Sequence, residues 1–130
     1  MESVIPAGYE RLLRDPNFGH LGTVRPDNSV QVNPMWFEYD GEFIRFTHTS
    51  RRAKYRNLQL NPSMSLSVVD PGDPETYLEV RGRLVESLPD PTGAFYVRLG
   101  RRYGNADQQA PPDSAVRVVL VMSIEKTTHM

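Results

Sequence analysis

The chain has 130 residues, 38% of them hydrophobic, and its 15 Lys and Arg residues against 16 Asp and Glu leave a net charge of −1. This length predicts one domain, residues 1–130, and the charge balance argues against a nucleic-acid partner, because such proteins use a basic excess to displace counterions from phosphates. The absence of cysteine excludes disulfides and thiolate chemistry, and the absence of an apolar run of about 18 residues argues against a membrane partner, so a cytoplasmic location is expected.

A short helix and three strands are expected in the first part of the chain. Tyr9, Leu12 and Leu13 share one side of a helix that ends at Asp15-Pro16. A hydrophobic period of two follows, and Asp40-Gly41 is a strong signal for a hairpin turn. The expected antiparallel strands are residues 18–25, 30–39 and 42–47.

Residues 47–61 predict a helix whose first turn is basic. Behind Ser50 as the N-cap, that turn carries Arg51, Arg52 and Lys54. The partial positive charge of a helix N-terminus disfavours each cation there by roughly 0.3 to 1 kcal/mol. The cations and the free backbone N–H groups together predict a site for an external anion such as a phosphate. The alternative is an ordinary solvated basic face of a surface helix.

In the second half of the chain, strands are expected at residues 64–69 and 77–86 and a helix at residues 91–103. A polar connection follows at residues 105–114, and a final strand at residues 115–125. The final strand is apolar on both faces, so it needs cover on both sides, either from the helices of a barrel or from another subunit. Six strands with two or three helices between them predict a mainly β fold, an antiparallel barrel.

Pro34 interrupts the strand expected at residues 30–39. Proline cannot donate to a strand ladder, so a bulge or an edge is expected here. The alternation that Val30 and Val32 begin also slips to Met35 and Phe37, so the sheet is expected to open at this point. Unpaired backbone groups at a bulge suit the edge of a planar heteroaromatic ring, although a barrel corner without a ligand is the alternative. Together with the anion site, this ring site predicts a flavin-like nucleotide.

Four stretches carry a family resemblance: residues 22–27, GTVRPD; 31–42, QVNPMWFEYDGE; 44–47, IRFT; and 52–58, RAKYRNL. They are similar to the pyridoxamine 5'-phosphate oxidase-like split-barrel family, and more narrowly to its short actinobacterial members that use the deazaflavin coenzyme F420 in place of FMN. The likeness extends over residues 7–125. It implies a six-stranded split barrel and a homodimer with the cofactor at the subunit interface.

By matching position, the resemblance assigns residues to each part of the cofactor. The tricyclic ring is expected against Val32, Asn33, Pro34 and Met35, partly through their backbone groups. The ribityl chain is expected along Phe46, Thr47, His48 and Thr49. The phosphate is expected at Ser50, Arg52 and Lys54. Tyr77 and Leu78 of the partner subunit are expected to close the site, and Arg117 to lie near the cofactor.

The resemblance implies an oxidoreductase in which reduced coenzyme F420 passes a hydride to a small conjugated acceptor such as an enone, quinone or tetrapyrrole. The alternatives are an FMN-dependent oxidase or reductase on the same fold and a carrier that binds coenzyme F420 without catalysis. No catalytic residue is assigned, because the cofactor carries the hydride and the common hydrolase, metalloprotease and phosphate-loop motifs are absent. The histidines are too scattered to argue for a metal, and His129 is expected in a loose tail.

Overall fold

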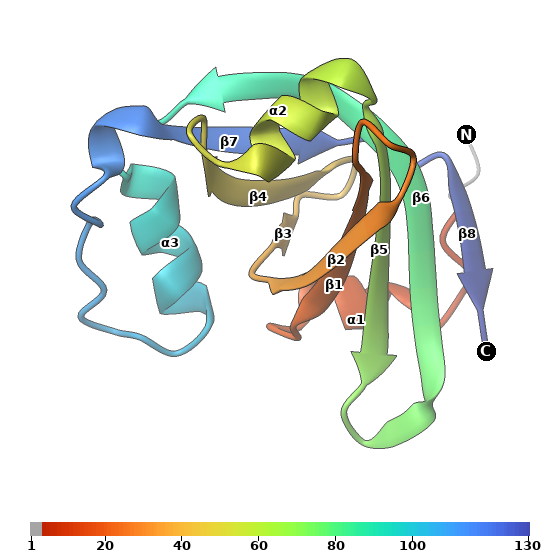
Figure 1. Cartoon of the computed structure of the whole chain (residues 1–130). Coiled ribbons are helices and arrows are strands. Elements are labelled where there is room, and N and C mark those ends of the chain that lie inside the picture. The colour runs from red at the N-terminus through yellow and green to blue at the C-terminus, as the bar shows by residue number, and fades with distance from the viewer. Residues whose placement is uncertain (1–3) are drawn as a thin grey trace.

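The computed structural model describes residues 4–130, in which alternating apolar residues form an antiparallel sheet (Figure 1). The strands are β1 Gly19–Val24, β2 Val30–Met35, β3 Glu38–Tyr39, β4 Ile44–Thr49, β5 Ser63–Asp70, β6 Asp73–Pro89, β7 Arg117–Met122 and β8 Lys126–His129. The helices are α1 Glu10–Arg14, α2 Ala53–Leu60 and α3 Ala94–Arg102, and a 3-10 turn spans Ser114–Val116. The predicted class, a mainly β antiparallel barrel with helices, is confirmed.

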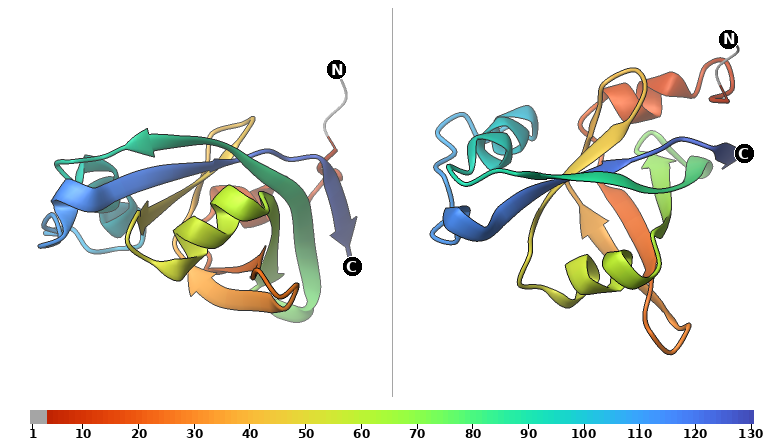
Figure 2. Two further views of the ribbon diagram at one scale, coloured as in Figure 1. Left: turned by 45° about the horizontal axis from the view of Figure 1, so that its top comes forward. Right: turned by 90° about the horizontal axis from the view of Figure 1, so that it is seen from above.

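The sheet is a barrel that does not close. Its strand order is β2-β1-β5-β6-β7-β4-β3, with β8 added to β6. The long strand β6 joins the two halves, because residues 77–83 pair with β5 and residues 84–89 pair with β7, with an irregularity between Leu84 and Glu86. Figure 2 shows α1 and α2 on opposite sides of the barrel and α3 set off at one end beside β7. Across residues 4–130, none of the helices has the length and apolar character needed to cross a bilayer.

The barrel is split between β2 and β3, which only Trp36 and Phe37 separate in the sequence. The Phe37 side chain is fully buried in the core. Its backbone N–H donates to the Tyr103 hydroxyl (3.1 Å), and its carbonyl accepts from Arg102 Nε (2.9 Å). Residues at the end of α3 therefore satisfy the backbone groups that a neighbouring strand would satisfy in a closed barrel.

The bulge predicted at Pro34 is absent. β2 pairs with β1 in unbroken register from Val30 opposite Val24 to Met35 opposite Gly19. Pro34 is tolerated because β2 is an edge strand, which within residues 4–130 has a neighbour on one side only. No strand of this range on the other side requires a hydrogen bond from the N–H that proline lacks. The opening of the sheet predicted for this segment lies two residues later, at Trp36-Phe37.

The basic helix also begins later than predicted. α2 starts at Ala53 with Arg52 as its N-cap residue, because β4 continues to Thr49 to pair with Arg117 of β7. Ser50 is not the cap: its hydroxyl donates to the Val116 carbonyl (3.4 Å). Of the three cations, only Lys54 lies in the first turn.

Within residues 4–130 there are eight strands in place of the six predicted. The segment 30–39 forms two strands, and residues 126–129 add β8. His129 belongs to β8, where its ring lies 4.7 Å from that of Tyr9, so the loose tail predicted for it is wrong. The last strand of the prediction, 115–125, is shorter in the structure, at Arg117–Met122.

Arg102 fastens α3 to the rest of the molecule. Besides the Phe37 carbonyl, its guanidinium donates to the carbonyls of Leu13 (3.1 Å), Arg14 (2.9 Å) and Asp15 (2.9 Å) at the end of α1. These carbonyls belong to a helix end, where backbone acceptors have no partner within the helix. One side chain thus connects α1, the split in the barrel and α3.

We expect Arg102→Ala to lower the free energy of unfolding by roughly 2 to 4 kcal/mol, because several hydrogen bonds to a charged donor are lost at once. Arg101→Ala is the matched control: Arg101 is exposed on the same turn and should change stability by about 0.5 kcal/mol or less. Urea unfolding of both variants measures the difference. Equal stabilities of the two variants would contradict this role for Arg102.

Candidate functional site

A buried cation without an anionic partner marks the site. Lys54, in the first turn of α2, is only 4% exposed, and its Nζ lies 3.5 Å from Met35 Sδ, a weak acceptor. No carboxylate in residues 4–130 forms an ion pair with it. Burial is the main cause that lowers the pKa of Lys54 from 10.5 to about 8, and the charge of Arg52 lowers it further. Such a group is costly to keep charged unless an anion arrives from outside the fold.

His48 is a second buried group without a partner. It follows Ile44 and Phe46 on the inward face of β4, where the core gives way to a cavity, and is 5% exposed. Its Nε2 is buried and has no hydrogen-bond partner in the described part of the chain. Burial is the main cause that lowers the pKa of His48 to about 4, and the charges of Lys54, Arg52 and Arg117 lower it further. The imidazole is therefore neutral at pH 7 and able to bond to a ligand.

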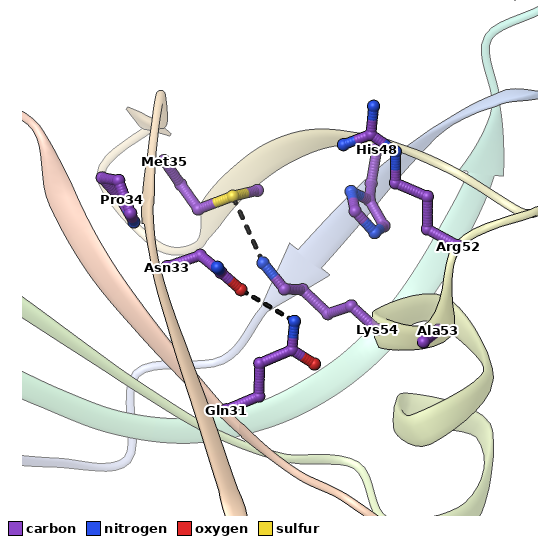
Figure 3. Close-up of a pocket in the computed structure, with 8 residues that line it drawn as sticks. All are labelled: Gln31, Asn33, Pro34, Met35, His48, Arg52, Ala53 and Lys54. Atoms are coloured by element: carbon purple, nitrogen blue, oxygen red, sulfur yellow. Dashed lines mark hydrogen bonds between the residues drawn. The ribbon is translucent and has the colours of Figure 1, made fainter.

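These groups line a cavity of about 540 Å³ between β2, β4 and α2, which we call the basic cavity. Figure 3 shows the Lys54 side chain reaching from α2 toward Met35 on β2, with His48 and Arg52 close by. The cavity is lined by Gln31, Asn33, Pro34, Met35, His48, Arg52, Ala53 and Lys54. The Arg52 guanidinium has no hydrogen bond or ion pair within residues 4–130, so the cavity has a surplus of positive charge.

A second cavity of about 360 Å³ adjoins the first, and we call it the aromatic cavity. It shares four lining residues with the basic cavity: Pro34, Met35, His48 and Arg52. The others are Phe18, Trp36, Thr47, Tyr96 and Arg117. A ligand in one cavity would therefore lie against a ligand in the other.

Arg117 is held firmly at the aromatic cavity. Its Nε donates to Asp113 Oδ1 (3.0 Å) and its Nη1 to Thr47 Oγ1 (3.5 Å), while its Cζ lies 4.8 Å from the centre of the Tyr96 ring. The guanidinium is thus positioned by an ion pair on one side and a cation–π contact on the other.

The structure brings together eight of the residues proposed from the sequence: Asn33, Pro34, Met35, Thr47, His48, Arg52, Lys54 and Arg117. Six others line neither cavity: Val32, Phe46, Thr49, Ser50, Tyr77 and Leu78. Strand alternation turns the Val32 side chain away, so that it is 58% exposed, and Phe46 and Leu78 are buried in the core. That Tyr77 and Leu78 close the cofactor site of a partner subunit stays a prediction.

Sequence reasoning missed Gln31 and Ala53 in the basic cavity, and Phe18, Trp36 and Tyr96 in the aromatic cavity. Gln31 could have been predicted from the sequence, because it precedes Asn33 by two positions and so lies on the same face of the strand. In the structure its side-chain amide donates to Asn33 Oδ1 (3.0 Å). Tyr96 gave no signal, since it comes from α3, far along the chain. Among the described residues, no cluster of acids and histidines is suited to hold a metal ion.

The chain was compared with known families and structures. The family model for pyridoxamine 5'-phosphate oxidase matches residues 5–130. A solved structure named F420 reductase is 52% identical, with a TM-score of 0.92 over 95% of this chain and 98% of that one.

Two further structures share the fold at low identity. A conserved hypothetical protein of Mycobacterium tuberculosis is 19% identical (TM-score 0.74, 99% of this chain and 88% of that one). General stress protein 26 of Bacillus anthracis str. Sterne is 19% identical (TM-score 0.71, 93% and 89%). A comparison with curated proteins gives no match.

We expect Lys54→Met to stabilise the ligand-free protein at pH 7 by up to roughly 3 kcal/mol. The folded protein releases the Lys54 proton near pH 8, whereas the unfolded chain holds it to pH 10.5. The unfolded state therefore binds more protons between these values, and the free energy of unfolding should rise with pH in that window. The variant should lack this rise.

Urea unfolding at pH 7 and at pH 9.5 checks this expectation. Arg51→Met is the control, because Arg51 is exposed beside the same helix and lines neither cavity. A Lys54→Met protein that is no more stable than the Arg51→Met protein at pH 7 would show that the buried ammonium carries no penalty.

Proposed function

Because the chain belongs to the pyridoxamine 5'-phosphate oxidase family, we propose that it is an oxidoreductase that binds coenzyme F420 in the basic cavity and reduces a conjugated organic acceptor. The 52% identical structure named F420 reductase supports the choice of cofactor. The enzyme is proposed to act as a cytoplasmic homodimer with the cofactor at the subunit interface.

One observation carries the proposal: Lys54 is buried and charged with no carboxylate beside it, and His48, whose buried Nε2 has no partner among the described residues, lines the same cavity. A phosphate-bearing ligand would provide both the missing negative charge and hydrogen-bonding oxygens. The residues present therefore fit a nucleotide-like cofactor. An ordinary basic surface face, the alternative from the sequence, does not account for a lysine that is 4% exposed.

In this proposal Arg52 and Lys54 bind the phosphate. The amides of Gln31 and Asn33 meet polar groups along the cofactor, and Pro34 and Met35 provide an apolar wall for the ring. The outer edge of β2 has no strand partner within residues 4–130, so its backbone groups are available to the ring edge. Val32 would take part in the same way, through its backbone.

When bound and reduced, the deazaflavin supplies the hydride, and the protein supplies position and electrostatics. Reduction of the acceptor's double bond would also need a proton, from the protein or from solvent. His48 is a poor source of the proton, since the pKa of its imidazolium is about 4 and that form is scarce at pH 7. We propose water or the hydroxyl of Tyr77, the residue expected from the partner subunit, as the proton donor in its place.

Titration of the purified protein with coenzyme F420 and with FMN, followed by absorbance and calorimetry, tests the cofactor. We expect coenzyme F420 to bind more tightly. Tight retention of FMN with no F420 binding would instead support an FMN-dependent enzyme. Turnover of reduced F420 with enones, quinones and tetrapyrroles then separates an enzyme from a carrier, which would bind the cofactor and reduce none of them.

Lys54→Met should weaken F420 binding by roughly 10- to 150-fold, the range for a lost hydrogen bond to a charged group. Arg51→Met should bind almost as well as the unaltered protein, because Arg51 lines neither cavity. Calorimetry of both variants gives the comparison. Equal losses in the two variants would point to general surface charge in place of a defined phosphate site.

Cofactor binding should take up protons. At pH 8 about half of the Lys54 side chains are neutral, and an adjacent anion raises their pKa, so up to roughly half a proton per site should be bound. Uptake through Lys54 should fall toward zero at pH 6. Calorimetry in Tris and HEPES, which differ in ionisation enthalpy, measures it. Persistence of the uptake in Lys54→Met would assign it to another group.

A further inference from the structure

We propose that the aromatic cavity is the acceptor site and that it selects planar conjugated molecules bearing a carboxylate. This inference rests on the proposed function for the identity of its neighbour in the basic cavity. Pro34, Met35, His48 and Arg52 line both cavities, so a molecule in the aromatic cavity would lie beside the cofactor, where an acceptor must be.

The first argument is the wall of aromatic rings. Trp36 lies 5.8 Å from Tyr96 and is stacked on Tyr103, with ring centres 5.5 Å apart and 13° between the planes. The Tyr103 hydroxyl is itself fixed, since it donates to the Asn17 carbonyl (2.7 Å) and accepts from Phe37 N–H (3.1 Å). The wall is thus held in place before a ligand arrives, which reduces the entropy lost on binding.

Phe18 adds an aromatic side chain that the core does not need. It is 59% exposed, yet it lies beside Tyr103 with ring centres 5.5 Å apart and lines the cavity. Exposed aromatic rings next to a fixed aromatic wall favour flat ligands, whose faces can stack on them. A saturated or branched molecule would lose these contacts.

The second argument is charge. Arg52 and Arg117 line the cavity, and no acidic residue does. Asp113 forms an ion pair with Arg117, but the hydrogen bonds of Arg117 to Asp113 and Thr47 use only three of its five N–H donors. Arg52 has no partner among residues 4–130. Arg117 therefore keeps two N–H donors for a carboxylate, and Arg52, which lines both cavities and is shared with the proposed phosphate site, adds positive charge where the cavities meet.

The competing interpretation is that these cations bind an anionic end of the cofactor itself. The two interpretations differ in what each cavity can hold at once. If the aromatic cavity is the acceptor site, a planar carboxylate and coenzyme F420 bind together. If it holds part of the cofactor, they compete.

The test uses coumarin-3-carboxylate as the probe and the ligand-free protein, whose single tryptophan is Trp36. Two analogues separate charge from shape: coumarin-3-carboxamide is flat but neutral, and cyclohexanecarboxylate is charged but not flat. Calorimetry and Trp36 fluorescence should show that the probe binds at least tenfold more tightly than either analogue. Equal affinities would overturn the proposal.

Variants locate the binding. Arg52→Gln should weaken probe binding five- to twentyfold and leave the carboxamide unchanged, whereas Arg51→Gln should alter neither. Tyr96→Leu should weaken the probe and the carboxamide alike, and Phe43→Leu, which alters a half-buried ring outside both cavities, should not. Phe18→Leu repeats the aromatic test at an exposed position if Tyr96→Leu fails to fold. Absence of any effect at Arg52 and at these rings would refute the site.

Repeating the titration with saturating coenzyme F420 gives the last outcome. Unchanged or tighter probe binding supports an acceptor site, and displacement of the probe assigns the cavity to the cofactor. Because the probe is first measured without cofactor, the two failures can be told apart: absence of F420 binding with intact probe selectivity removes the proposed function, and with it the role of acceptor site, but leaves the site for planar carboxylates. Weak, unselective probe binding with tight F420 binding removes this inference alone.

Discussion

The structure depends on how the unpaired backbone groups between β2 and β3 find hydrogen-bond partners. A sheet that stops short of closure leaves backbone groups that must find partners elsewhere. Here Phe37 fills the core with its side chain, while Tyr103 and Arg102 bond to its backbone. The same two residues hold the end of α3 against the gap. The break in the barrel and the docking of α3 are therefore one feature, and the aromatic cavity forms where they meet.

The basic cavity carries the opposite kind of constraint. A lysine held among buried groups lowers the stability of the empty protein, as the depressed pKa of Lys54 indicates. His48 adds a buried nitrogen that no described residue satisfies. Groups that a ligand would complete, and that the fold leaves incomplete, are typical of binding sites, where stability is given up for function.

The alternation of apolar residues was enough to locate most of the sheet and its class, because strand periodicity is a local property. The start of α2 was misplaced for a non-local reason: Ser50 has the chemistry of an N-cap, but pairing of β4 with β7 extends the strand past it. Pro34 correctly marked an edge, although the break lies at Trp36-Phe37.

The basic cavity was largely predictable, since Asn33, Met35, His48 and Lys54 lie within a short stretch of chain with a family resemblance. The aromatic cavity was not. Its lining includes Phe18, Trp36 and Tyr96, which come together only when α3 packs against the split barrel. No pattern in the sequence predicts that packing.

The two cavities also draw on different parts of the chain. β2, β4 and the start of α2 build the basic one, whereas the aromatic one adds residues from α3, from β7 and from the segment just before β1. Substitutions on α3 can therefore reshape the aromatic cavity while the basic cavity keeps its charges and its lining. Such a division would let the aromatic cavity change in shape while the buried charge of the basic cavity stays in place.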